Sequence, residues 1–93
     1  MVQHYLVKGR VQGVGFRWFV HGEAARIGLC GWVKNTDDGH VEAVAAGSSK
    51  QIEALVVALH QGTRGSRVDA VEIQEMDENE AAELHTFQIE GAW

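Results

Sequence analysis

The 93-residue sequence predicts one α+β domain, residues 1–93, in which two helices cover one face of an antiparallel sheet. Two observations predict this fold class. Two stretches carry apolar residues at helical spacing, and each is followed by a glycine where a helix would end. The other apolar stretches are short and rich in strand-forming residues. No apolar run approaches the roughly 20 residues that a bilayer-spanning helix needs, so we expect no membrane association.

The first half of the chain is predicted to hold three strands and one helix. These elements are a strand at 3–8, a glycine-rich loop at 9–15, a helix at 16–27, a strand at 29–34, a turn at 35–39 and a strand at 40–46. The helix is predicted because Phe16, Phe19, Val20, Ala24 and Ile27 recur at helical spacing before Gly28. The Asp-Gly pair at 38–39 favours a tight hairpin turn.

The second half is predicted to hold one helix and two strands. A helix runs from Ser48 or Ser49 to Gly62, followed by a loop at 63–67, a strand at 68–76, a polar connection at 77–83 and a short strand at 86–89. Gln51 stands in capping-box position to Ser48. The predicted core face of this helix consists of Ile52, Leu55, Val56 and Leu59, which follow an i, i+3, i+4, i+7 pattern.

The order strand–helix–strand–strand–helix–strand is that of the ferredoxin-like, two-layer βαββαβ sandwich. Its antiparallel sheet has the strand order 4-1-3-2, with both helices on one face; the stretch 86–89 adds a short C-terminal strand. Because the third strand lies between the first two, those two are parallel and end at the same edge. We therefore expect Arg17, beyond the loop that follows the first strand, to lie near Asn35, which follows the second strand.

Charge is distributed unevenly along this acidic chain, whose net charge is −5. Residues 1–22 contain Lys8, Arg10 and Arg17 but no carboxylate, whereas no lysine or arginine follows Arg67. The acidic total argues against nucleic acid and anionic membranes as partners, and the basic N-terminal segment favours a small anionic ligand. The single cysteine, Cys30, fits a reducing, cytoplasmic location, and we expect a monomer.

The loop at 9–15 has the composition of an anion-binding loop. Its glycines allow sharp turns and a close backbone approach, and it leads directly into a helix N-terminus, which favours negative charge. Arg17 lies in the first helical turn, where its positive charge is unfavourable to the helix dipole. A cation at this position makes sense if an anion lies between it and the amides. The predicted phosphate-binding residues are Val11, Gln12, Gly13, Val14, Gly15, Phe16 and Arg17. A glycine-rich connection that only makes a turn is an equally good reading of the loop alone.

Two long segments closely resemble the signatures of the acylphosphatase family. They are VKGRVQGVGFR at 7–17 and GWVKNTDDGHV at 31–41, and the resemblance continues through 67–72 and 87–89. It implies a small stand-alone enzyme that hydrolyses acyl phosphates to carboxylate and inorganic phosphate without a cofactor or metal. It also implies that Arg17 is the phosphate ligand and that Asn35 positions water. The loop 62–65 departs from the family pattern, because relatives often carry proline there and this chain has none.

The residue chemistry agrees with that implied mechanism. The leaving carboxylate, whose conjugate acid has a pKa of about 4, needs no general acid at neutral pH. Phosphoryl transfer depends mainly on positioning and charge stabilisation, which amides, one arginine and one asparagine can supply. Two alternatives stay open: a phosphate-binding regulatory module without turnover, and an RNA-binding module. The RNA-binding module would need exposed aromatic residues on the central strands, where the first strand has only Tyr5.

Several further residues have a functional and a plain structural reading. Arg10, Thr36 and His21 are possible contributors to the site, but a solvated loop position for Arg10, a turn role for Thr36 and a surface position for His21 are the favoured interpretations. The five histidines show no ligand spacing, so no metal site is expected. Trp18, Trp32 and Cys30 are predicted to pack in the interior, with Cys30 as a buried, unreactive thiol.

Overall fold

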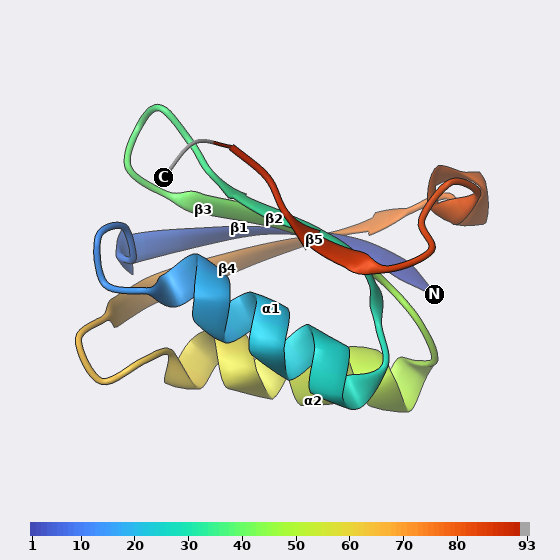
Figure 1. The fold of residues 1–93 in the computed structure, drawn as a ribbon, viewed down its shortest axis with the longest axis horizontal. Helices are drawn as coiled ribbons and strands as arrows, with labels where there is room; N and C mark the ends of the chain where they lie inside the picture. Colours follow the sequence, from blue (N-terminus) through green and yellow to red (C-terminus); the bar gives the residue numbers. More distant parts are fainter. Residues whose placement is uncertain (92–93) are drawn as a thin grey trace.

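The computed structural model of the protein describes residues 1–91, and Figure 1 shows two helices packed beneath one sheet. The elements are β1 (Val2–Arg10), α1 (Phe16–Ile27), β2 (Cys30–Asn35), β3 (Val41–Ala46), α2 (Ser49–Gln61), β4 (Arg67–Met76), a short 3-10 helix (Glu78–Ala81) and β5 (Phe87–Ile89). The predicted order of elements is therefore confirmed. Only the 3-10 turn, which lies within the predicted polar connection, was not expected.

The sheet has the order β4-β1-β3-β2-β5, which confirms the predicted 4-1-3-2 arrangement and its extra C-terminal strand. β1 pairs antiparallel with β3 and β4, and β2 pairs antiparallel with β3. β5 runs parallel to β2, so the complete sheet is mixed rather than purely antiparallel. Because β3 is antiparallel to both β1 and β2, those two strands point the same way and end at one edge.

The core lies between the sheet and the two helices. Alternate residues of the central strands face the helices and are fully buried, including Tyr5 and Val7 of β1 and Val33 of β2. The helices contribute Phe16, Val20, Ala24, Ile52, Leu55, Ala58 and Leu59. The predicted core faces are thus largely correct, although Phe19, Ile27 and Val56 are only partly buried at the edge of the core.

Both tryptophans that were predicted to pack in the interior lie elsewhere. Trp18 is 54% exposed on α1. Gly31 and Val33 take the buried positions of β2, so Trp32 points to the helix-free face of the sheet, where the Nζ of Lys34 lies 5.1 Å from the centre of its ring. Cys30 lies on that same face and is partly exposed, so the prediction of a buried thiol was wrong.

Within residues 1–91, neither helix combines the length and apolar character that a bilayer crossing would require.

Candidate active site

The end of β1 directs the chain into the glycine-rich loop. The pairing of β1 with β4 shifts register between Lys8 and Gly9, and Gly9 has a φ of +135°. A Cβ at Gly9 would overlap the carbonyl oxygen of Arg67 and lie 2.9 Å from the amide nitrogen of Asp69. Glycine is therefore required here both by the backbone conformation and by the close approach of β4.

The N-terminus of α1 lacks the side-chain cap that α2 has. The residue before α1 is Gly15, in left-handed conformation with a φ of 76°, and it offers no capping side chain. By contrast, Ser48 accepts a hydrogen bond from the Gln51 amide at the start of α2, and the Gln51 side chain completes the capping box. The N-terminus of α1 therefore combines a favourable helix dipole with first-turn amides that no capping side chain covers, which is the arrangement that binds an anion.

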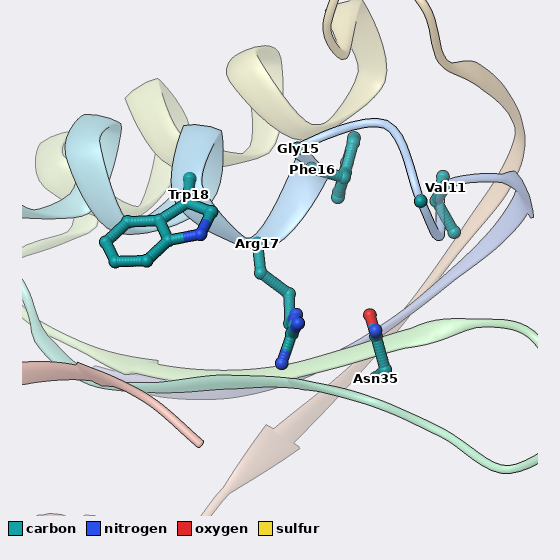
Figure 2. Close-up of a pocket in the computed structure, with 7 residues that line it drawn as sticks. Val11, Gly15, Phe16, Arg17, Trp18 and Asn35 are labelled. Carbon is teal, nitrogen blue, oxygen red and sulfur yellow. The ribbon is translucent and has the colours of Figure 1, made fainter. Parts of the chain in front are cut away.

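A pocket of about 110 Å³ lies at this helix terminus. It is lined by Val11, Gly13, Gly15, Phe16, Arg17, Trp18 and Asn35. Figure 2 shows that Arg17 extends from α1 toward the sheet, whereas Asn35 rises from β2 toward the loop, so that the two side chains converge on one space. Two residues that the topology placed at one edge thus line the same pocket.

Asn35 is the last residue of β2, and its side-chain oxygen is an unused acceptor. The Oδ1 atom is buried, and no group among residues 1–91 donates a hydrogen bond to it. An unsatisfied buried acceptor costs about 1–3 kcal/mol, so each such atom in a native protein calls for an explanation, such as a bound water or a catalytic role. An oxygen of this kind beside an anion-binding helix terminus is well suited to accept a hydrogen bond from water.

Arg17 is oriented by the C-terminal strand. Its Nη1 donates a hydrogen bond of 3.2 Å to the backbone carbonyl of Glu90, which follows β5. Glu90 is itself held by its own amide, which donates to the carbonyl of Val33 in β2 over 2.8 Å. Sequence reasoning missed this partner, because a backbone carbonyl can be supplied by any residue type and leaves no pattern in the sequence.

The turn after Asn35 is closed by Thr36. The Thr36 hydroxyl accepts a hydrogen bond of 3.0 Å from the amide of His40 and donates one to the carboxylate of Asp38. The hydrogen bond from Thr36 lowers the pKa of Asp38 below its usual value, and a backbone hydrogen bond at Asp38 lowers it further. Thr36 thus has the turn role that the sequence left open.

The predicted site residues divide into those that line the pocket and those that do not. Val11, Gly13, Gly15, Phe16, Arg17 and Asn35 line it, whereas Gln12 and Val14 are absent from its walls. Trp18 lines it although it was predicted only to pack. Arg10 is exposed at the end of β1, and His21 packs with its ring 6.3 Å from that of Phe87; neither lines the pocket.

Among residues 1–91, no three histidine, cysteine, aspartate or glutamate side chains are grouped so that they could hold a metal ion.

Comparison with known proteins gives a consistent result. The family model named Acylphosphatase matches residues 3–89. An acylphosphatase of Koribacter versatilis is 50% identical over 91 residues, which are 98% of this chain and 81% of that protein. The crystal structure of acylphosphatase from Bacillus subtilis superposes with a TM-score of 0.86 at 40% identity and covers 98% of this chain and 100% of that one.

The same fold also occurs within a longer protein. The crystal structure of HypF from T. kodakarensis matches 99% of this chain with a TM-score of 0.83 at 33% identity, but the match covers only 12% of HypF. The family match, the sequence identity over nearly the whole chain and the superposed fold agree with the resemblance seen in the two motifs. The chain belongs to the acylphosphatase family.

Proposed function

We propose that this chain hydrolyses the carboxyl–phosphate bond of acyl phosphates, releasing a carboxylate and inorganic phosphate. In this proposal the amides of residues 11–16 and the guanidinium of Arg17 hold the phosphate, and Asn35 orients the attacking water. The observation that carries the proposal is the convergence of Arg17 and Asn35 on one pocket at the uncapped N-terminus of α1.

Binding in this pocket is electrostatic. Amides at the start of α1 donate to phosphate oxygens, and the positive end of the helix dipole favours the dianion. Arg17 adds a planar pair of donors that matches two phosphate oxygens. Its hydrogen bond to the Glu90 carbonyl restricts the side chain, which lowers the entropy lost on binding.

The chemical step requires little beyond positioning. The Oδ1 of Asn35 accepts one hydrogen bond from water and so aims a lone pair of the water at the phosphorus atom. A phosphoryl oxygen accepts the proton that the water releases. The carboxylate leaves without protonation because its conjugate acid, with a pKa of about 4, is ionised at neutral pH. The developing charge on the phosphoryl oxygens is stabilised by the amides and Arg17. An alkyl phosphate would need its leaving oxygen protonated, so we expect poor turnover of such substrates.

Within the same proposal, the chain acts as a cytoplasmic monomer on small molecules and not on nucleic acid. The net charge of −5 supports this, since nucleic-acid binding relies on cationic surfaces. Tyr5, the only aromatic residue of β1 and β3, is buried against the helices, which also supports it, because an RNA-binding sheet of this fold presents aromatic residues of its central strands to solvent. Size-exclusion chromatography with light scattering tests the monomer.

The central test is phosphate release from benzoyl phosphate and from an alkyl phosphate, each with and without a chelator. We expect chelator-insensitive cleavage of the acyl compound alone. Replacing Arg17 by alanine should lower kcat/KM by at least about 10³-fold, and Asn35→Ala should lower kcat by about 10²–10³-fold. Asn35→Ala should still be inhibited by inorganic phosphate, because the amides of residues 11–16 and Arg17, which bind the phosphate, are intact.

Two substitutions of the same residue types serve as controls. Arg26→Ala and Asn79→Ala remove an exposed arginine and an exposed asparagine outside the pocket, and both should keep wild-type turnover. Turnover that survived Arg17→Ala and Asn35→Ala would contradict the assigned site. Phosphate binding without any cleavage of the acyl compound would instead favour a regulatory module.

A further inference from the structure

The side chain of Gln12 joins the phosphate loop to the hairpin that follows Asn35. Its Nε2 lies 2.8 Å from the carbonyl oxygen of Thr36 and 2.8 Å from that of His40, and donates a hydrogen bond to each. A side-chain amide has two N–H donors, and this geometry uses both of them. Gln12 therefore contributes a two-point contact between segments that are distant in the sequence.

The two acceptor carbonyls are those that close the hairpin. The amide of Thr36 donates to the His40 carbonyl over 2.9 Å, and the amide of Gly39 donates to the Thr36 carbonyl over 3.3 Å. Each carbonyl oxygen has a second lone pair, and the Gln12 amide uses it. Gln12 thus contacts a turn whose backbone is already fixed by its own hydrogen bonds. The contact therefore holds the loop at a defined distance from the turn.

The ends of this contact lie beside the two halves of the proposed site. Gln12 stands in the loop between Val11 and Gly13, which both line the pocket, and Thr36 directly follows Asn35. The loop turns at Gly13 and Gly15, whose φ values of 73° and 76° lie in the left-handed region that favours glycine. A Cβ at Gly13 or Gly15 would meet no group within 4 Å, so the loop does not pack closely against other segments at these two positions.

We propose that Gln12 is a positioning residue that fixes the distance between the bound phosphate and the water held by Asn35. This inference rests on the proposed roles of the loop amides and Asn35. The side chain touches no reacting atom. It acts by holding the phosphate-binding amides of the loop at a fixed position relative to the Oδ1 of Asn35. A misplacement of about 1 Å between reacting groups can cost about 10²-fold in rate, so such a contact has a measurable effect on kcat.

The experiment compares Gln12→Leu with a matched control, Gln51→Leu. Leucine is close to glutamine in size and cannot donate. Gln51 also joins two segments through its side-chain amide, because its Nε2 donates to the carbonyl of Ile27 over 3.1 Å. That contact lies at the opposite end of α1 from the pocket, and Gln51 also caps α2. Both variants therefore lose partly buried tertiary hydrogen bonding, but only Gln12→Leu loses it beside the site.

With benzoyl phosphate, we expect Gln12→Leu to lower kcat by about tenfold to 10²-fold. The inhibition constant of inorganic phosphate should change by less than about threefold, because the loop amides and Arg17 remain. Gln51→Leu should lower the melting temperature and leave kcat unchanged. A Gln12→Leu enzyme with wild-type kcat would overturn the inference, as would an equal loss of kcat in Gln51→Leu.

A double substitution separates positioning from general loosening. In an Asn35→Ala background there is no oriented water left to misplace, so adding Gln12→Leu should change the residual kcat by less than about twofold. Full multiplication of the two single effects would show that Gln12 acts independently of Asn35 and would overturn the inference. The side-chain amide resonances of Asn35 give a direct readout: they should shift in Gln12→Leu and not in Gln51→Leu.

Failure of the inference can be told apart from failure of the proposed function. If Arg17→Ala and Asn35→Ala keep turnover, the site itself is wrong. If they lose turnover while Gln12→Leu matches the wild type, only the role of Gln12 is wrong. Should Gln12→Leu fail to fold, Gln12→Asn keeps the amide but is one methylene too short to reach both carbonyls, and the same split between kcat and phosphate inhibition is expected.

Discussion

Gly9 stands where β1 turns into the phosphate loop, and its surroundings leave no room for a side chain. A Cβ there would overlap the Arg67 carbonyl, and its φ of +135° is unfavourable for any other residue. We expect Gly9→Ala to lower the free energy of unfolding by at least about 2 kcal/mol, because both the backbone strain and the overlap must be relieved. Urea unfolding followed by circular dichroism measures this change.

Gly22 provides the opposite case within the same chain. It lies inside α1, is exposed, and has no neighbour within 4 Å of its Cβ position. Replacing it by alanine should raise the free energy of unfolding by about 0.5–1 kcal/mol, since alanine loses less backbone entropy in a helix. A destabilised Gly22→Ala variant in the same urea experiment would contradict this reasoning.

At the scale of residues, the sequence indicated Arg17 and Asn35 but not the backbone groups that contact Arg17 and Gln12. Both are parts of recognisable motifs, and the topology predicted that they meet. The partners of Arg17 and Gln12 are the backbone carbonyls of Glu90, Thr36 and His40, which leave no trace in residue identity. For that reason Gln12 was placed in the site for its backbone amide, whereas the structure shows a side chain that contacts the hairpin.

At the scale of elements, the two helices begin in chemically different ways. α2 is closed by the capping box of Ser48 and Gln51, whereas α1 follows Gly15 and has no side-chain cap. Ser48→Ala should therefore lower the free energy of unfolding by about 1 kcal/mol and leave turnover unchanged, because α2 lies away from the pocket. Thermal unfolding and a benzoyl phosphate assay check the two parts of this prediction.

Ser49→Ala is the control for that prediction. Ser49 is the exposed first residue of α2 and does not hold the cap position. Its replacement should change stability by less than about 0.5 kcal/mol, as is usual for exposed sites. Equal losses for the two serines would show that the capping hydrogen bond contributes little.

Element types were predictable from apolar spacing, whereas the choice of buried face in β2 was not. The strand alternates Gly31, Val33 and Asn35 with Cys30, Trp32 and Lys34, and both sets contain apolar residues. Residue size favoured Trp32 as a core residue, but β2 packs its small and branched positions against α1. Position 31 itself requires glycine, because a Cβ there would overlap the carbonyl oxygen of Val44.

At the scale of the whole molecule, the order of the sheet brings the site together. β3 between β1 and β2 makes those strands parallel, so that the loop after β1 and the end of β2 share an edge. β5 adds to the open side of β2 and places Glu90 against Arg17. The sequence predicted the first relation from the order of elements, but the parallel register of three residues in β5 is too short to be read from periodicity.

Folding also removes the only tyrosine of the chain from solvent. Tyr5 lies in the core with no exposed surface, and its hydroxyl donates to the Oε1 of Gln3 over 3.0 Å. Burial raises the pKa of Tyr5 well above its ordinary value of 10, and the nearby carboxylate of Glu75 raises it further. The folded protein therefore keeps a proton that the unfolded chain releases at alkaline pH.

This difference predicts how stability changes at high pH. Above pH 10 the unfolded state binds fewer protons than the folded state, so the free energy of unfolding falls as pH rises, by up to about 1.4 kcal/mol per pH unit. Tyr5→Phe removes this dependence, so its urea midpoint should decline less between pH 10 and about 11.5 than that of the wild type, because all other ionisable groups are common to both proteins. Because Tyr5 is the only tyrosine, tyrosinate absorbance reports it alone and should appear together with unfolding. Tyrosinate absorbance that developed near pH 10 in the folded protein would show that Tyr5 ionises without unfolding and would contradict the prediction.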